Sequence, residues 1–555
     1  MRKLVLLVIA FTITMPSMMK AGGLLTNTNQ NLAFYKSMAR EGAIAIDGVY
    51  SNPAGVVFLP LGMHLSLNIQ SASQTRTATT TFGPFIYGVD NNSDTKEFKG
   101  KANVPFIPSI QAAYNTGKWS FQFGFAFTGG GGKCTFDNGL GSFESVVAML
   151  PLLSQNMDAL STQMGLGALG LPAIQKYDVD MYLSGKQYYM GFTFGAAYKV
   201  TEKFSVYGGV RLLYGTSHYN GYVKNIQVDM GNGLVSAPQT FTSLYQQASS
   251  AVEQYTAAAQ QAQQAGNATA AAQYAQLAKE YTIKAGMLGT LGTATQDVTL
   301  DCKQTGIGIA PIIGLDYNFG DFNIGAKYEF RTKMTLKNKA TSSESANNLS
   351  ALAKYRDGAK VREDSPALLT LGVQYSGINK LRLNAGLHYY FDKQSKQYND
   401  MQEKLDKNTI EYLIGAEYDI NKRIDVGVGA QLTRYGMTDD YISDVSFNVN
   451  SYSIGVGLGY RINDKLKVNI GYFQTNYENY NRETQDYNNL SKTAGTMVGN
   501  FVTKLAGEAS GAQAAQIVQS ALTTPDASTG KSLLYGADSF TRTNRVFAVG
   551  IDIDF

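Results

Sequence analysis

The sequence is poor in charge. Asp, Glu, Lys and Arg make up 16% of its 555 residues, against about a quarter in ordinary soluble proteins. The formal net charge of +4 is small for this length and gives no reason to expect a nucleic-acid partner. Gly, Tyr and Phe are abundant, with 57, 35 and 27 copies, which suits lipid-facing strands and tight turns. The composition therefore argues against several ordinary soluble domains.

Residues that carry catalysis or bind metals are also scarce. The three histidines, His64, His218 and His388, fall on separate predicted strands. No HExxH, GxSxG or phosphate-loop pattern is present, and the glycine run 129–132 is not followed by Lys-Ser/Thr. We therefore expect no enzyme activity, no metal site and no cofactor.

Long hydrophobic runs are missing as well. Residues 1–21 combine Arg2 and Lys3, the apolar run 4–15 and small residues around Ala21, which is the pattern of a cleaved secretory signal. That run is too short to span a bilayer, which needs about 20 residues, and no later stretch reaches that length. We expect an exported chain that is either soluble or a β-barrel, whose strands need only about ten residues each.

One pattern recurs from Gly62 onward: about ten residues alternate large apolar with small or polar ones, and a turn follows. In the segment 380–392, Leu383 and Leu387 belong to the apolar set, whereas Asn384 and His388 belong to the other. The segments 424–432 and 452–461 repeat it. Since side chains alternate between the faces of a strand, each segment has one apolar face and one polar or glycine face.

Three features favour a membrane barrel over a soluble sandwich. Tyr and Phe cap the apolar faces, as at Phe204 and Tyr214, which resembles an aromatic girdle. The final strand alternates up to Phe555, which resembles the signal read by the barrel-assembly machinery. Short turns alternate with longer connections; they are predicted at Asn115-Thr116-Gly117, Thr201-Glu202, Phe319-Gly320, Ser376 to Asn379, Asn421-Lys422 and Asn463-Asp464.

The sequence therefore predicts an all-β transmembrane fold, a multi-pass antiparallel barrel of about 14 strands in a bacterial outer membrane. We expect a signal peptide at 1–21, an N-terminal hatch or plug at 22–60 and the barrel at 61–555, surrounded by outer-membrane lipids. Short turns would face the periplasm, and large extracellular loops would lie at about 130–186, 217–303 and 479–541.

These loops carry helical patterns at 143–163, 244–288 and 490–522, the second broken at Gly266-Asn267. Their apolar residues either pack on one another above the barrel or form a landing site for a hydrophobic ligand.

The segment before the first strand does not alternate. Its run 43–57 is too apolar to sit in water, and a barrel of this size is open unless something fills it. The turn-forming sequence Asn52-Pro53-Ala54-Gly55 lies within this run. We therefore expect the segment to plug the lumen rather than to form a loose leader.

This motif, together with the strand at 365–375, resembles the family of outer-membrane long-chain fatty-acid and aromatic-hydrocarbon transporters (FadL-like). The resemblance implies a barrel with an N-terminal hatch that contains Asn52, Pro53, Ala54 and Gly55. It also implies capture by outer loops, a luminal site, and lateral exit near a kinked third strand, here 119–127 with Gly124 as the candidate kink. The long segments 244–288 and 490–522 exceed what the family implies and leave the substrate open.

Strand parity places several charged side chains in the lumen, where they would either meet a ligand carboxylate or form an ion-paired lining. Near the outer strand ends, Cys134 and Cys302 are either bridged, as an exported compartment permits, or free thiols. The cationic candidates are Arg211, Lys327, Arg331, Arg382 and Arg461, and the same parity places the acids Glu329, Glu411, Glu417 and Asp425 in the lumen.

The leading hypothesis is passive uptake of hydrophobic small molecules, such as long-chain fatty acids or hydrocarbons. A general diffusion porin for polar solutes is the alternative. A non-transporting surface or adhesion barrel, in which the large loops would be the active part, is a further one.

Overall fold

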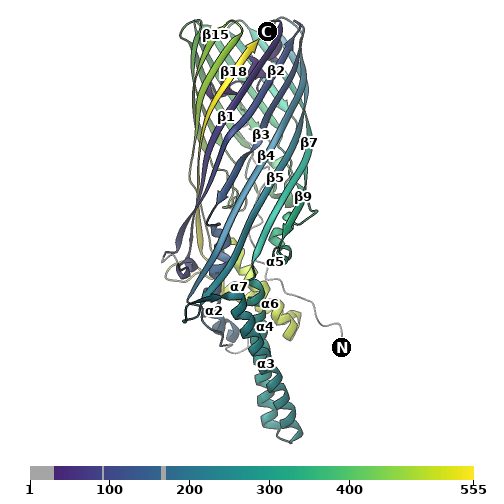
Figure 1. Cartoon of the computed structure of the whole chain (residues 1–555), viewed down its shortest axis with the longest axis vertical. Helices are drawn as coiled ribbons and strands as arrows, with labels where there is room; N and C mark the ends of the chain where they lie inside the picture. The colour runs from purple at the N-terminus through teal and green to yellow at the C-terminus, as the bar shows by residue number, and fades with distance from the viewer. Residues whose placement is uncertain (1–30, 90–92, 164–169) are drawn as a thin grey trace.

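The computed structural model describes residues 31–89, 93–163 and 170–555. The predicted signal peptide lies outside these residues. The described strands form one closed antiparallel barrel, because β1 (Gly62–Phe82) pairs with β2 (Thr95–Asn115) on one side and with β18 (Gly536–Asp554) on the other (Figure 1). No helix among these residues is long and apolar enough to cross a membrane.

The wall contains 14 strands, as predicted. Three of them are interrupted: β8 (Phe322–Glu329) continues as β9 (Thr335–Ser342), β10 (Lys360–Arg362) as β11 (Leu368–Ile378), and β16 (Leu466–Tyr477) as β17 (Tyr480–Thr484). A short strand, β6 (Leu234–Ser236), pairs only with β5. The other wall strands are β3 (Trp119–Phe136), β4 (Lys176–Lys199), β5 (Phe204–Asp229), β7 (Val298–Phe319), β12 (Leu381–Tyr390), β13 (Thr409–Asp419), β14 (Ile424–Arg434) and β15 (Ser451–Asn463).

The predicted alternation is confirmed by burial. On β14, Val428 is 50% exposed on the outer face. Gln431, three residues further along the same strand and therefore on the opposite face, is 2% exposed. Six connections at one end are short, at 116–118, 200–203, 320–321, 379–380, 420–423 and 464–465. Exposed aromatic residues gather beside these turns, for example Trp119 against Tyr198 with ring centroids 4.7 Å apart. This end therefore has the short turns and the aromatic girdle that the sequence predicted.

The strands extend further at the opposite end than predicted. β4 has 24 residues and β5 has 26, although about ten suffice to cross a bilayer. Strand pairing continues beyond the apolar band, where side chains such as Asp180 replace the outward apolar residues. The expected loops at about 130–186, 217–303 and 479–541 are therefore too long, and the unpaired connections are 137–175, 237–297 and 485–535.

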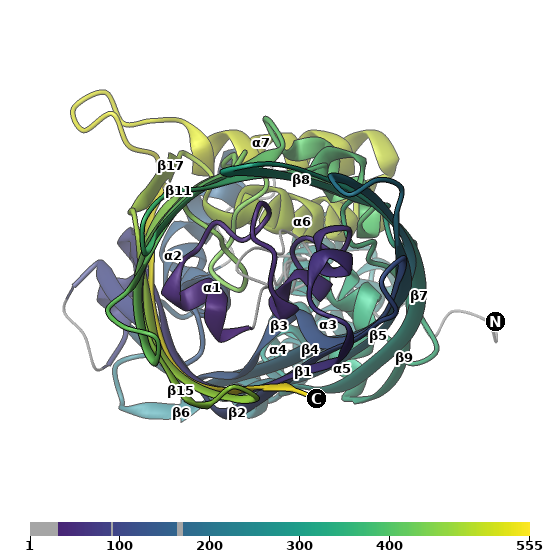
Figure 2. The ribbon, with the colours of Figure 1, turned by 90° about the horizontal axis from the view of Figure 1, so that it is seen from above.

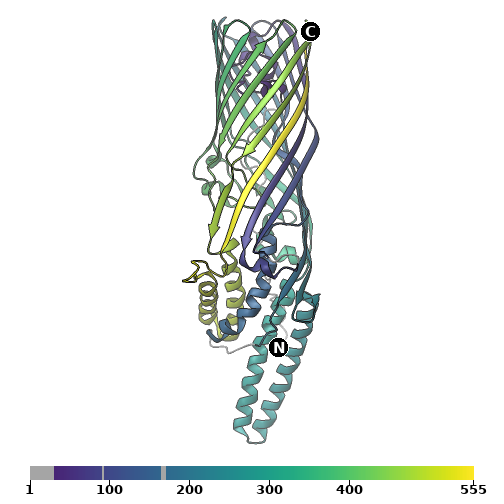
Figure 3. The same cartoon turned by 90° about the vertical axis from the view of Figure 1, so that its left-hand side faces the viewer.

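Helices stand at this opposite end. A hairpin of α3 (Ala237–Gln264) and α4 (Ala268–Ala294) projects along the barrel axis, and α2 (Gly141–Gln163), α6 (Leu490–Ala506) and α7 (Glu508–Thr523) lie nearer the barrel (Figures 1 and 3). All three predicted helical segments are confirmed. The hairpin turns at Gly266, whose φ is +74°, and Asn267 caps α4 by accepting from the Ala270 amide at 3.0 Å.

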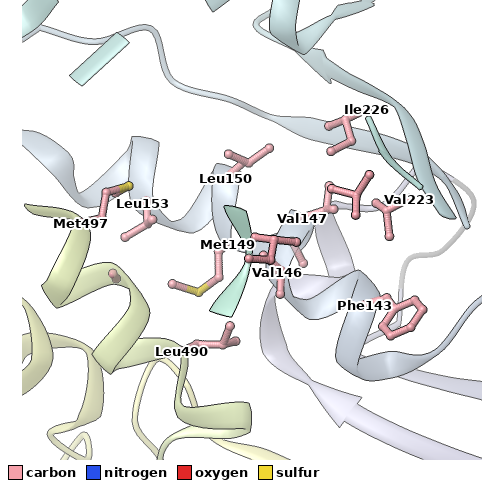
Figure 4. Packing of buried hydrophobic residues seen from close by; sticks show 14 of the residues in the cluster. Phe143, Val146, Val147, Met149, Leu150, Leu153, Val223, Ile226, Leu490 and Met497 are labelled. Atoms are coloured by element: carbon pink, nitrogen blue, oxygen red, sulfur yellow. The ribbon is translucent and has the colours of Figure 1, made fainter. Parts of the chain in front are cut away.

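α2 is packed on more than one side. Leu150 and Val147 face Ile226 and Val223 at the end of β5, and Leu153 faces Met497 of α6 (Figure 4). These residues belong to one large buried cluster that joins the helices to the strand ends. The apolar residues of α2 therefore pack against the other helices and the strand ends. This is one of the two interpretations that the sequence left open, and we call the assembly of α2, α3, α4, α6 and α7 the helical cap.

The N-terminus of α2 is held by a buried carboxylate. The Ser142 amide donates to Asp444 Oδ2 at 2.8 Å, and Asp444 is 1% exposed. Burial, together with the nearby Asp538 carboxylate, raises the pKa of Asp444 to about 6.

The lumen is filled at the short-turn end by residues 31–60, which we call the plug (Figure 2). It contains α1 (Leu32–Lys36), η1 (Ile46–Val49) and η2 (Gly55–Phe58). Its backbone runs against glycines on the inner face of the wall. A Cβ on Gly429 would lie 2.5 Å from the Met38 amide nitrogen, and one on Gly427 would lie 2.5 Å from the Lys36 carbonyl oxygen. The glycine face of the strands thus makes room for the plug.

We expect Gly429→Val to weaken plug docking by about 1–3 kcal/mol, because the side chain would collide with plug backbone that cannot rotate away. Hydrogen exchange at the amides of residues 31–60 measures this as loss of protection. Gly208→Val on β5 is the control, since a Cβ there meets nothing within 4 Å. Equal protection in both variants would contradict the close approach.

We expect Asp444→Asn to stabilise the helical cap at pH 8. The folded-state pKa of Asp444, about 6, lies above the usual value of about 3.9, so wild-type stability falls as pH rises from about 4 to about 6. The variant keeps an acceptor for Ser142 and lacks this charge, whose full cost is about 3 kcal/mol at most. Thermal unfolding at pH 4 and pH 8 should show a small advantage at pH 4 and the full advantage at pH 8. The exposed Asp440→Asn serves as control, and an advantage that is the same at both pH values would refute the explanation.

Candidate functional site: the plugged lumen and a break in the wall

The Asn52-Pro53-Ala54-Gly55 motif joins the plug to four neighbouring strands. Asn52 Nδ2 donates to Asp316 Oδ2 on β7 at 2.6 Å, and Gln122 Nε2 on β3 donates to the Pro53 carbonyl at 2.7 Å. Ser205 Oγ on β5 donates to the Ala54 carbonyl at 2.7 Å. The Ala54 methyl group packs in a small apolar cluster that includes residues of β4, β5 and β7. The motif is therefore a docking element that spans β3 to β7.

The opposite side of the plug is anchored by charge. Lys36 is hydrogen-bonded to Asp425 and lies 3.5 Å from Glu417. Arg40 contacts Glu417 and also binds Asp47 within the plug, Nε to Oδ2 at 2.8 Å. All five side chains are at least nine-tenths buried. Removing one partner of such a network leaves a buried unpaired charge, so the network resists stepwise opening.

A second polar contact lies deeper in the lumen. His388 on β12 is sandwiched between Glu41 of the plug and Glu411 of β13, with Nε2 to Oε1 at 2.8 Å and Nδ1 to Oε2 at 2.9 Å. Tyr390 Oη donates to the same Glu411 oxygen as the histidine at 2.9 Å. The cavity beside these groups measures about 20 Å³, which is room for about one water molecule. The plug therefore leaves no ligand-sized space at this point of the lumen.

Four of the five predicted luminal cations have protein partners. Arg211 pairs with Glu329 at 2.6 Å, and Lys327 Nζ donates to the Tyr50 carbonyl of the plug at 2.6 Å. Arg382 pairs with Asp419 at 2.6 Å, and Arg331 donates to the Gln394 carbonyl at 2.5 Å. Arg461 lines a cavity of about 430 Å³ at the short-turn mouth. These contacts favour the lining interpretation for all but Arg461.

Hydrogen bonding in the wall is interrupted between β2 and β3. The two strands pair from Gly100 to Ala102 and again from Ile110 to Asn115, and the register is broken between these stretches. On the other side of β3, pairing with β4 shifts between Phe127 and Gly129, and again between Gly130 and Lys133. Residues 103–109 of β2 and 126–133 of β3 are therefore not paired with each other, although β2 stays paired with β1 and β3 with β4 along most of these stretches, and β3 is irregular there.

The position of this irregularity corrects the prediction for Gly124. Gly124 is paired with Gln111 on β2 and with Thr193 on β4, so it lies in regular sheet. Its inner surface lies against the plug, since a Cβ there would be 3.2 Å from Val49 Cγ1. The backbone departs from the ladder later, where Gly130 has φ +91° and Gly132 has φ +42°. The glycines in the sequence identified β3 as the irregular strand. They did not show that Gly130 and Gly132, rather than Gly124, have the unusual backbone angles.

Of the two alternatives for the cysteines, the structure has free thiols, at Cys134 and Cys302. Cys134 pairs with Gly185 on β4, Gly185 with Tyr219 on β5, and Tyr219 with Cys302 on β7. Two strands thus separate the cysteines, which places their Cα atoms roughly 14 Å apart at the usual strand spacing. A disulfide requires less than about 7 Å.

Sequence reasoning missed the plug cations, Lys36 and Arg40. Both lie in a segment without regular alternation, so parity could not assign them a direction. Their acidic partners Glu417 and Asp425 were placed in the lumen by parity, and an excess of inward acids on β13 and β14 was the available signal. Among the described residues, no group of three or more His, Cys, Asp or Glu is arranged to hold a metal ion.

Comparison with known proteins identifies the fold. The family model described as "Outer membrane protein beta-barrel domain" matches residues 352–499, whereas no curated protein is significantly similar in sequence. The crystal structure of a Pseudomonas aeruginosa FadL homologue is similar over 96% of this chain and 100% of that chain, with 12% identity and a TM-score of 0.57. The Pseudomonas putida toluene transporter TodX is similar over 97% and 100%, with 11% identity and a TM-score of 0.50.

The match extends over nearly the whole chain. At this level of identity it is a statement about fold. The chain is an outer-membrane β-barrel with the fold of FadL-like transporters.

Proposed function

We propose that this chain takes up hydrophobic small molecules passively across the outer membrane and releases them sideways through the wall between β2 and β3. The observation that carries the proposal is the interrupted pairing at 103–109 and 126–133. Unsatisfied backbone groups are costly in a bilayer. A break in strand pairing that had no function would therefore be expected to close. A hydrophobic molecule also gains by passing directly into lipid, because release into water is unfavourable.

The plug supports this route over a straight pore. It is held by the charge network at Lys36 and Arg40, by His388, and by the Asn52 motif, and the cavity beside it holds about one water molecule. A general diffusion porin needs an open aqueous lumen. The plugged lumen therefore counts against the polar-solute alternative.

The projecting α3–α4 hairpin is the feature that favours the surface-protein alternative. Its tip stands well beyond the barrel (Figure 3), and its outer part is exposed and rich in Ala and Gln. Two solved structures of similar fold are a FadL homologue and a toluene transporter, which supports hydrophobic cargo as the first hypothesis.

Planar bilayers and proteoliposomes separate these functions. We expect the purified chain to show no large steady ion conductance, because the plug fills the lumen, and to accelerate entry of a labelled long-chain fatty acid or toluene into liposomes. Deleting residues 31–60 should open steady conductance. Large conductance of the intact chain without hydrophobic uptake would overturn the proposal in favour of a porin. The absence of both conductance and uptake would favour a surface protein.

We expect Gly130→Val to reduce hydrophobic uptake at least several-fold. A β-branched residue is strained at φ +91°, so the local path of β3 must change. Heat-modified mobility on gels reports whether the barrel still assembles. The control is Gly124→Ala, in regular sheet; uptake lost equally in both variants, or retained in Gly130→Val with an assembled barrel, would argue against an exit at this position.

A further inference from the structure

Two arginines face each other inside the barrel without an acidic partner. Arg76 of β1 and Arg542 of β18 are directly opposite in the register. Both point inward, since their neighbours of the same parity, Ala78 and Phe540, are fully buried. The outer face of β1 carries its last exposed large apolar side chain at Ile69. The arginine pair therefore lies on the extracellular side of the lipid-facing band, above the plug.

The surroundings of this pair supply hydrogen-bond acceptors but no negative charge. Arg76 Nε donates to Gln74 Oε1 at 3.2 Å. Arg542 donates to the Phe447 carbonyl at 3.1 Å and to the Asn448 side chain, and its Nε is buried without a partner.

Arg542, Cys134, Tyr219 and Tyr477 act electrostatically on Arg76, and none of these groups is a carboxylate. Within the described part of the chain, no carboxylate forms a salt bridge with Arg76 or Arg542.

Four other inward arginines differ from this pair. Arg40, Arg211, Arg382 and Arg482 each have a carboxylate partner, such as Asp538 for Arg482 at 2.6 Å. Like charges directly opposite on neighbouring strands destabilise a sheet, and both arginines are partly buried, so water screens their repulsion less than at an open surface. The pair at Arg76 and Arg542 is thus a charge arrangement that the chain leaves uncompensated.

We propose that Arg76 and Arg542 bind the anionic group, a carboxylate or a phosphate, of an amphiphilic molecule in the outer part of the lumen. Guanidinium groups present paired donors that match the oxygens of either group. An anion between them would replace repulsion by two attractions and can accept from the unsatisfied Arg542 Nε. This inference rests on the proposed function only for the hydrophobic part of the ligand.

The apolar part of the ligand is suggested by what adjoins the pair. One step along the strands, Ala78 and Phe540 belong to a buried apolar cluster with Phe447 and Val449. The Arg542 guanidinium also lies over the Tyr477 ring, 4.9 Å from its centroid, and Tyr477 packs on that cluster. An anionic head at the arginines would therefore place an attached hydrocarbon chain beside apolar and aromatic side chains.

Binding of hexadecanoate, its neutral methyl ester and inorganic phosphate to the full-length chain in non-ionic detergent tests the site. We expect hexadecanoate to bind more tightly than the ester. Arg76→Gln and Arg542→Gln should each raise the dissociation constant for hexadecanoate about ten-fold or more, the effect of losing a charge-assisted hydrogen bond, without changing that for the ester. Arg545→Gln, exposed and pointing outward on the same β18 strand, is the matched control.

Thermal unfolding without ligand gives a readout that does not depend on the cargo. Because each substitution removes like-charge repulsion, neither variant should unfold at a lower temperature than wild type. Phosphate should raise the unfolding temperature of wild type and of Arg545→Gln, but not of Arg76→Gln combined with Arg542→Gln.

The outcomes separate this site from the transport proposal. Arginine-dependent protection by phosphate, with no binding of either hydrocarbon, would support the anion site and contradict hydrophobic cargo. Equal binding of acid and ester in all variants, without phosphate protection, would overturn the anion site while leaving hydrophobic uptake intact. Destabilisation of both variants without ligand, with no change in phosphate protection, would show that the arginines are structural and would also overturn it.

Discussion

The rest of the structure depends on the requirement that backbone N–H and C=O groups be paired in hydrocarbon. Strands meet it only when the sheet closes, as it does through β1 and β18. Closure at 14 strands creates a lumen that side chains of the wall alone do not fill. The plug fills it, and inward glycines such as Gly429 allow its backbone to approach the wall. The glycine-rich composition is thus explained by the plug as well as by turns.

Within such a wall, a break in strand pairing leaves backbone groups unpaired, which is costly in hydrocarbon. We therefore expect a break to persist only where it has a function or where other groups cover it. The break between β2 and β3 is bordered by glycines with backbone angles that other residues rarely adopt, and the plug motif docks on β3 through Gln122. Plug, break and cap are therefore parts of one arrangement. In the transport that we propose, cargo enters past the helices, the plug bars the axis, and the break between β2 and β3 is the way out to the side.

Strand parity and turn spacing predicted most of the fold from sequence, because a period of two and tight turns are local signals. Parity placed Arg211, Arg382 and His388 in the lumen. Their partners depend on strand register and on the plug, which no local pattern encodes, so ligand-binding and ion-paired roles could not be separated. The same limit explains the error at Gly124 and the uncertainty over Cys134 and Cys302. The pair Arg76 and Arg542 escaped notice because only the register brings them opposite each other.

The central claim, that cargo leaves through the wall while the plug stays in place, is tested most directly by fixing the plug. A Cβ on Gly415 would lie 3.0 Å from Ser37 Cβ, about 0.5 Å less than the shortest usual Cβ–Cβ separation in a disulfide, so a small backbone shift lets a bridge form. In a variant with Ser37→Cys and Gly415→Cys, and with Cys134 and Cys302 replaced by serine, uptake of labelled fatty acid into proteoliposomes is measured before and after reduction. The account predicts equal uptake in both states. Uptake that is absent when the plug is cross-linked and restored by reduction would contradict it.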